Sequence, residues 1–173
     1  MSDSKTLHGE EALAKMREII GHSPTCHFLS GLDQRPIPAR PMHTVEVDDL
    51  GAFWFLGSTH TDLVEDLMKS AEVQLLYANP EEAEYLTVFG HATVVRDEGR
   101  MAELRSRRSA GPITVWSMLE EKDACAIKVE PQNSYYRDAK GGKATTVLSM
   151  MVAGVFGQKG NEAVKGPIIT PKG

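Results

Sequence analysis

The chain has 173 residues, 41% of them hydrophobic and 25% charged, and a formal net charge of −5. This length suits one domain with a substantial core, and the acidic balance argues against nucleic acid as a partner, because phosphate backbones require a basic surface. No apolar run could span a bilayer, and the polar first residues do not resemble a signal peptide. We therefore expect a cytoplasmic protein without membrane contacts. In that reducing compartment, Cys26 and Cys125 should be reduced and buried.

Hydrophobic periodicity and turn residues predict short strands with a few helices between them. The single domain is expected over residues 8–156. The first half is expected to contain a disordered start (1–7), a helix (8–20), a strand (26–32), a strand from Ile37 to a tight turn closed by Gly51, and a buried strand (52–56). A helix (62–69) with Leu63, Val64, Leu67 and Met68 inward, a strand (72–78), a long strand (84–96) and a helix capped by Asp97 (to about 107) follow. The last part is expected to contain a short helix from Pro112, strands 124–130 and 134–138 joined by a turn at Pro131-Gln132, a helix (147–156) and a flexible tail (157–173).

Short strands bounded by turn signals, without regular strand–helix alternation, favour a barrel over a parallel sheet. We therefore predict an α+β protein, a β-barrel of about six strands with helical additions. Gly90 interrupts the alternation of the longest strand, which predicts a bulge or a close approach of another chain.

The loop at residues 57–61 combines small and hydroxyl residues at the start of a helix, where an anion can bind. The first N–H groups of a helix have no partner within the helix, and its dipole is positive there. Arg40, on the preceding strand, could point its guanidinium at the same place. Two ordinary alternatives fit the same spacing: Thr59 with Asp62 resembles a capping box, and Arg40 could be a surface residue.

Several motifs occur in a characteristic order. They are Arg40-Pro41-Met42, the turn at Asp49–Gly51, Phe53-Trp54-Phe55 with Ser58, Glu84–Gly90 with Val94–Asp97, Lys128–Pro131, and Tyr135–Asp138. Together they resemble the FMN-binding split-barrel superfamily of pyridoxamine-5'-phosphate-oxidase-like proteins, most of all its general-stress-protein branch. The resemblance covers roughly residues 10 to 152 and implies an antiparallel split barrel with Greek-key-like connections.

The resemblance further implies a stress-related flavoprotein that binds FMN, or else FAD, at the interface of a homodimer. A flavin site needs an anion pocket, a flat slot and hydrogen-bonding edges. Trp116 and Tyr136 are candidates for closing the slot, or are ordinary core or surface aromatics. The residues implied for cofactor binding are Arg40, Pro41, Met42, His43, Leu56, Gly57, Ser58, Thr59, Thr61, Asp62, Trp116 and Tyr136. No catalytic residue is assigned, and the small-molecule substrate is unknown.

Three positions depart from the family pattern. Leu63 stands where a lysine commonly helps to hold the phosphate, and Val45 stands where a polar residue is often found. Asp62 adds a negative charge next to the expected phosphate. These departures weaken the predicted phosphate contacts, so a non-catalytic flavin-binding, haem-binding or storage module, or an interaction protein without a cofactor, remains an alternative to an oxidoreductase.

Other chemistries lack their usual motifs. No two histidines have a spacing typical of metal ligands, so no metal site is predicted. His60 is read as a solvated loop residue. Gly141-Gly142-Lys143 lacks the other residues of a phosphate-binding P-loop, and neither a dinucleotide fingerprint nor a nucleophile elbow is present.

Overall fold

The computed structural model describes residues 7–107, 121–138 and 147–151, and all structural statements below concern these residues. Residues 1–6, the helix predicted from Pro112, Trp116 and the tail at 157–173 lie outside them. No described helix is long and apolar enough to cross a membrane.

The described residues form eight strands, three α-helices and one short 3-10 helix. They are β1 (Leu7–His8), α1 (Gly9–His22), β2 (Thr25–Leu29), β3 (Ala39–Val47), β4 (Phe53–Ser58), α2 (Asp62–Lys69), β5 (Glu72–Asn79), β6 (Glu84–Val95), α3 (Glu98–Ser106), a short 3-10 helix η2 (Glu121–Asp123), β7 (Ala124–Asp138) and β8 (Val147–Met151).

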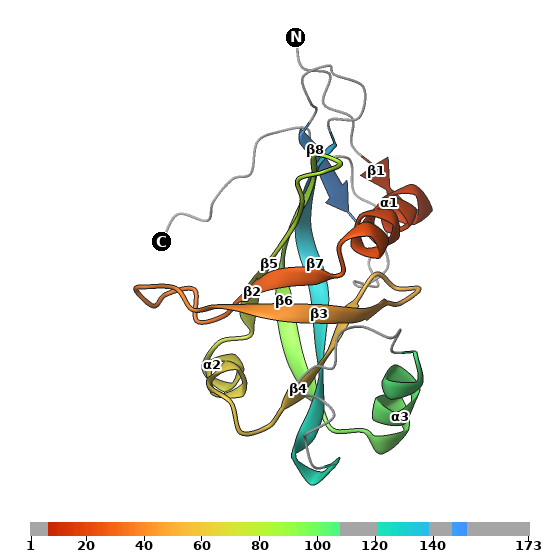
Figure 1. Cartoon of the computed structure of the whole chain (residues 1–173). Helices are drawn as coiled ribbons and strands as arrows, with labels where there is room; N and C mark the ends of the chain where they lie inside the picture. Colours follow the sequence, from red (N-terminus) through yellow and green to blue (C-terminus); the bar gives the residue numbers. More distant parts are fainter. Residues whose placement is uncertain (1–6, 108–120, 139–146, 152–173) are drawn as a thin grey trace, which may run out of the picture.

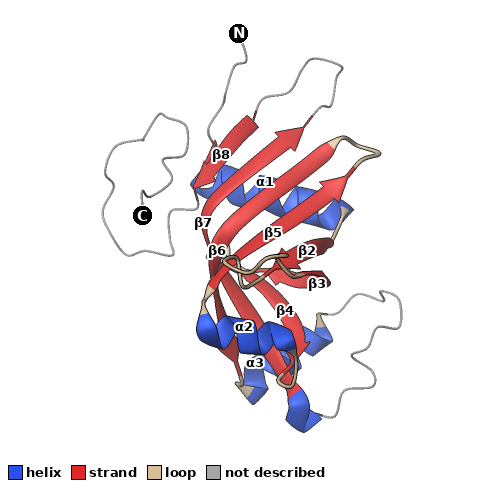
Figure 2. Cartoon of the chain, turned by 90° about the vertical axis from the view of Figure 1, so that its left-hand side faces the viewer, coloured by secondary structure: helices blue, strands red, loops and turns tan. Residues whose placement is uncertain are grey.

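Six antiparallel strands close into a barrel in the order β2-β3-β4-β7-β6-β5 and back to β2 (Figure 1). Strand β8 pairs antiparallel with β7, and β1 pairs parallel with β8. The successive strands β4 and β5 are not neighbours, so the connection through α2 crosses one end of the barrel. Figure 2 shows α1 at one end of the barrel and α2 and α3 at the other. The predicted antiparallel split barrel with peripheral helices is confirmed.

The hairpin between β3 and β4 forms around Asp48, as predicted. Gly51 adopts a φ of +83°, a conformation that favours glycine. One carboxylate oxygen of Asp48 accepts hydrogen bonds from the N–H groups of Leu50 (3.0 Å) and Ala52 (2.9 Å). The other oxygen accepts one from Trp54 Nε1 at 2.8 Å. This hairpin fixes the register of β3, the strand that carries Arg40.

The turn predicted at Pro131-Gln132 is wrong, because β7 runs without interruption over 15 residues. Pro131 lies opposite Gly90, where the register between β6 and β7 shifts. A shift of this kind tolerates a proline, which has no N–H to donate. A Cβ added at Gly90 would clash with the carbonyl of Glu130. The predicted bulge is confirmed, and the segment that approaches Gly90 closely is β7 of the same chain.

The helix predicted over 147–156 is also wrong in its first half. Residues Val147–Met151 form β8, which pairs with residues 134–137 of β7. Pairing with an existing strand edge overrides a weak local preference. Residues 152–156 lie outside the described ranges.

Both cysteines are buried, as predicted. Burial raises the pKa of the Cys26 thiol to about 12, and burial also raises the pKa of Cys125. Both thiols are therefore protonated at neutral pH, and neither is a nucleophile.

Helix α2 packs its apolar side onto the barrel core. Leu63, Val64 and Leu67 are buried there, with Leu63 only 4% exposed. Met68, predicted to face inward, is instead 79% exposed. Leu63 is thus a core residue, and a lysine in its place would have its ammonium buried in the barrel.

We expect Leu63→Lys to destabilise the protein by about 2 kcal/mol or more, because it removes a buried side chain and buries a charge. The loss corresponds to a melting temperature lower by about 4–8 °C. Met68→Lys is the matched control, since it makes the same chemical change at an exposed position of the same helix and should leave the melting temperature nearly unchanged. Equal effects of the two substitutions would contradict the packing of α2 described here.

Candidate functional site

The loop between β4 and α2 uses its hydroxyl groups to fix its own shape. Thr61 is the N-cap of α2: its Oγ1 accepts a hydrogen bond from the N–H of Val64 (3.5 Å) and donates one to the carbonyl of Ser58 (3.0 Å). Thr59 donates its N–H (2.8 Å) and its hydroxyl (3.2 Å) to the carbonyl oxygen of Asp123. The predicted cap at Thr59 is therefore wrong by two residues, because Thr59 bonds to Asp123, the residue before β7, and Thr61 caps the helix.

Arg40 lies beside α2, where its guanidinium contacts a buried carboxylate. Nη1 donates to Ser30 Oγ (2.7 Å), and Nη2 donates to Asp66 Oδ2 (3.1 Å). Ser30 Oγ donates to the same carboxylate oxygen at 2.8 Å, and Gln34 Nε2 donates to Oδ1 at 2.9 Å. Arg40 was predicted to face the first residues of the helix; it is bonded instead one turn further along, to Asp66.

Asp66 is ionised although it is only 6% exposed. Burial by itself would raise the pKa of this carboxyl, but hydrogen bonds from Gln34, Ser30 and Arg40, with the charge of Arg40, lower the pKa below its ordinary value of 3.8. The sequence analysis missed Asp66. The available signal was an acid between Leu63 and Leu67 on the inward side of a helix, because a buried carboxylate requires a compensating cation.

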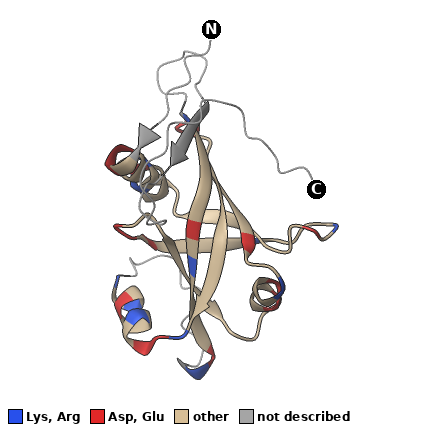
Figure 3. Ribbon diagram, turned by 180° about the vertical axis from the view of Figure 1, so that it is seen from behind, with Lys and Arg blue, Asp and Glu red and all other residues tan. Residues whose placement is uncertain are grey.

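A hollow of about 600 Å³ opens beside this ion pair, between the β2–β3 connection and α2. Its lining contains two cations and four carboxylates. The lining residues are Gly31, Asp33, Gln34, Pro38, Arg40, Asp62, Glu65, Asp66, Lys69 and Ser70. Figure 3 shows acidic and basic residues together on α2. Arg40 and Asp62, two of the predicted cofactor residues, thus lie at one hollow, whose formal charge is negative.

A second hollow of about 910 Å³ lies on another side of α2 and is mainly apolar. Val64, Met68 and Val94 are its apolar lining residues. Its lining residues are Thr59, Val64, Glu65, Met68, Lys69, Val94 and Arg96. The predicted residue Thr59 therefore faces a different hollow from Arg40, and the two hollows have α2 between them.

The remaining predicted cofactor residues are distributed as follows: Met42, Leu56, Gly57 and Tyr136 are buried, His43 and Ser58 are half-buried, and Pro41 and Thr61 are exposed. Tyr136 belongs to the core, with the ammonium of Lys15 5.6 Å from its ring centroid. Within this chain it contacts α1 rather than the Arg40 region. His60 is an exposed loop residue whose Nε2 lies 3.2 Å from Asp123 Oδ1.

The family model described as "Pyridoxamine 5'-phosphate oxidase like" matches residues 11–161. The chain belongs to the pyridoxamine 5'-phosphate oxidase-like family. No curated protein matches the sequence. Solved structures of this family's fold resemble the chain at low sequence identity, which shows the fold alone.

Three of these structures illustrate the range of proteins with this fold. A protein related to general stress protein 26, from Clostridium acetobutylicum, has a TM-score of 0.62 and 17% identity, over 78% of this chain and 92% of that one. A pyridoxamine 5'-phosphate oxidase-related, FMN-binding protein from Nostoc punctiforme has a TM-score of 0.54 and 10% identity, over 75% and 85%. A haem-binding protein from Mycobacterium smegmatis has a TM-score of 0.58 and 12% identity, over 79% and 57%.

The phosphate of FMN does not fit the hollow beside Arg40 as it is arranged in this chain. A phosphate dianion requires uncompensated cations or free N–H groups. Here Arg40 is bonded to Asp66, and Asp62 and Glu65 place further negative charge at the first turns of α2. In this member of the pyridoxamine 5'-phosphate oxidase-like family, Arg40 joins β3 to α2 through its ion pair with Asp66.

We expect the stabilising effect of Asp66 to disappear in acid. A carboxyl whose pKa is lowered by folding stabilises the folded state above its unfolded value of 3.8, and this contribution is lost as the pH falls through the lower folded value. Relative to Asp66→Asn, whose amide does not titrate, the wild type should therefore lose unfolding free energy through this acid range. Denaturant titrations between about pH 7 and about pH 3 measure the difference.

Glu65→Gln is the control, because Glu65 is an exposed carboxylate on the same helix. It should keep the pH dependence of the wild type. Identical pH dependence in the wild type and in Asp66→Asn would contradict the assigned role of Asp66.

Proposed function

We propose that this chain is a flavin-binding protein that recognises the isoalloxazine ring system at the α2 end of the barrel and lacks a strong phosphate clamp. The observation that carries the proposal is a pair of hollows on the two sides of α2, one reaching β3 and the other the end of β6, in a chain that belongs to the pyridoxamine 5'-phosphate oxidase-like family. Both hollows have volumes typical of small-ligand sites. One structural neighbour is described as FMN-binding. When bound, the flavin itself would supply redox chemistry, and no residue of this chain is assigned as an acid or base.

The charges beside Arg40 determine which flavin binds best. The four carboxylates of this hollow repel the phosphate of FMN, and they repel the pyrophosphate of FAD more. Riboflavin has the same ring and no phosphate, so it avoids this repulsion. We therefore expect riboflavin to bind at least as tightly as FMN, and FAD to bind more weakly than both.

A haem-binding or storage module is the second candidate function, favoured by the neighbour described as a haem-binding protein. Haem iron is usually held by histidine, cysteine, methionine or tyrosine. The described linings of the two hollows contain only Met68 from this set. This residue composition supports a flavin better than a haem.

The visible absorption spectrum of the purified protein, before and after reconstitution with an excess of flavin, separates the two functions. Flavin bands that survive desalting support the proposal, whereas a Soret band supports the haem alternative. A protein that retains neither chromophore after separate reconstitutions with flavin and with haem would refute both. If flavin is retained, its reduction by NADH or NADPH would separate an oxidoreductase from a carrier.

We expect Asp66→Asn to raise the affinity for FMN about tenfold or more, because it releases the Arg40 guanidinium for a charge-assisted contact worth about 1.5–3 kcal/mol. Riboflavin affinity should not change, since riboflavin carries no phosphate. Flavin fluorescence titrations of both ligands against both proteins test this expectation. Arg96→Ala distinguishes the second hollow: a selective loss of FMN affinity in this variant would place the phosphate there and contradict the Arg40 assignment.

We also propose that the chain forms a homodimer through the outer face of β6 and β7, with the flavin between the subunits. Tyr85 is 41% exposed there, and Phe89 and Tyr135 are half-buried. A stable interface should bury at least about 1,000 Å². Sedimentation at micromolar concentration should show a dimer for the wild type and a monomer for Tyr85→Asp. A monomeric wild type would contradict this proposal.

A further inference from the structure

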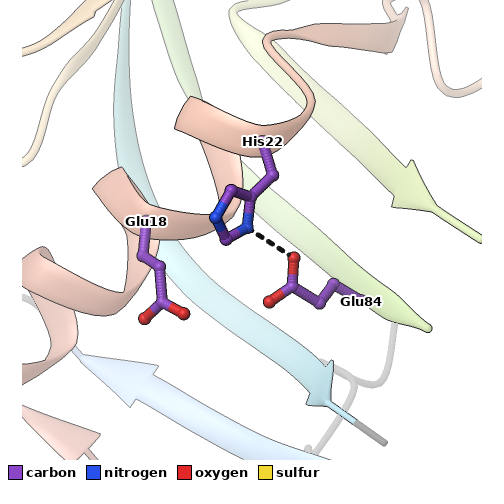
Figure 4. Close-up of side chains that lie close together, drawn as sticks. All are labelled: Glu18, His22 and Glu84. Carbon is purple, nitrogen blue, oxygen red and sulfur yellow. Dashed lines mark hydrogen bonds and ion pairs between the residues drawn. The ribbon is translucent and has the colours of Figure 1, made fainter. Parts of the chain in front are cut away.

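Three potential metal ligands meet where α1 crosses the start of β6, at the end of the barrel away from α2 (Figure 4). Glu18 and His22 are four residues apart on α1, so they project from the same side of the helix. Glu84 is the first residue of β6, and its side chain is fully buried. One ligand atom from each of these residues lies within 4.8 Å of the other two.

The arrangement around His22 and Glu84 already brings a nitrogen and an oxygen ligand together. His22 Nδ1 lies 2.8 Å from Glu84 Oε2. Asn79 Nδ2 lies 3.5 Å from the same oxygen, where it can orient the carboxylate. Outer residues of this kind hold metal ligands in place. The Glu18 and His22 side chains are 45% and 41% exposed, so water can reach the remaining coordination positions.

Lys15 supplies the positive charge in the absence of a metal ion. Its ammonium lies 3.1 Å from Glu18 Oε1 and 3.9 Å from Glu84 Oε1. Two carboxylates this close repel each other and require a cation between them. A divalent ion at this place would satisfy that requirement with twice the charge and would displace Lys15 from the carboxylates.

We propose that Glu18, His22 and Glu84 form a binding site for a first-row divalent cation, which clamps α1 to β6. One imidazole and two carboxylates suit ions such as Zn²⁺ or Mn²⁺, and three protein ligands leave room for water. Metal–ligand bonds of about 2.0–2.2 Å place ligand atoms about 3.4 Å apart in a tetrahedral site. The longer separations, up to 4.8 Å, must therefore shorten by about 1.4 Å, and the His22–Glu84 pair, now 2.8 Å apart, must open by about 0.6 Å. The half-exposed side chains of Glu18 and His22 can make these movements.

Spacings among histidines and cysteines predicted no metal site, because carboxylates were not considered as their partners. A glutamate four residues before a histidine on one side of a helix is also a ligand pair. The third ligand, Glu84, is 62 residues further along the chain than His22, and only the barrel topology brings it to α1.

Thermal melts of the full chain with Zn²⁺ or with EDTA test the proposal. With Zn²⁺ at about 100 times its dissociation constant, the melting temperature of the wild type should exceed its value in EDTA by about 5–10 °C. His22→Ala should lose this shift, and isothermal titration should show Zn²⁺ affinity lower by at least about tenfold, since loss of even an outer partner has such effects. His27→Ala, an exposed histidine on β2, is the matched control and should respond as the wild type does.

The Lys15→Met variant is an independent test of the proposal. It removes the competing ammonium and keeps an unbranched side chain against Tyr136, so this variant should bind Zn²⁺ more tightly than the wild type does. If His22→Ala does not fold, Glu18→Gln replaces it, because Glu18 lies on the exposed side of the site. An unchanged wild-type melting temperature in Zn²⁺, or equal responses of the wild type and His22→Ala, would overturn the proposal and leave the cluster as an ion pair that joins α1 to the barrel.

Discussion

The buried ion pair between Arg40 and Asp66 connects the parts of the structure on which the proposed site depends. Through Ser30 and Gln34 it joins the end of β2, the following loop, β3 and α2. A buried carboxylate without its cation would destabilise the fold strongly. The same pair holds α2 across the barrel end. Because Asp66 neutralises the Arg40 guanidinium and accepts one of its hydrogen bonds, Arg40 attracts an anionic ligand only weakly.

Each of the three α-helices in the described part of the chain is joined to the barrel by a carboxylate and a cation on opposite elements. Arg40 of β3 binds Asp66 of α2, and Lys15 Nζ of α1 lies 3.9 Å from Glu84 Oε1 of β6. Glu46 of β3, with its side chain 13% exposed, binds Arg100 of α3 (2.8 Å) and Arg107 at its C-cap (2.6 Å). The Arg100 guanidinium also lies 4.2 Å from the ring centroid of Trp54. Arg100 and Arg107 therefore help to hold α3 on the barrel.

Much of the barrel could be predicted from the sequence because its signals are local. The alternation of Val73, Leu75 and Tyr77, the turn at Gly51 and the interruption at Gly90 each have one structural consequence. The prediction failed where pairing between distant segments decides the outcome. Strand β8 forms because residues 134–137 offer it an edge, and Pro131 continues a strand because Gly90 lies opposite.

The candidate site was predictable only as a location. The resemblance to the family points to the region around β3 and α2, which stays a prediction, and Asp66, which contributes to the charge of that region, matches no motif. In the sequence, Asp66 between Leu63 and Leu67 fits an ordinary helix. Only the fold shows that Arg40 lies opposite its carboxylate. Charge compensation between distant residues is set by tertiary structure, and no spacing rule in the sequence reports it.

A crystal structure of the protein grown with saturating FMN tests the central claim most directly. Our account predicts the isoalloxazine ring at the α2 end of the barrel, with Arg40 still bonded to Ser30 and Asp66 and with no contact between Arg40 and the phosphate. An Arg40 guanidinium turned from Asp66 onto the phosphate, or a flavin bound at another part of the chain, would contradict it.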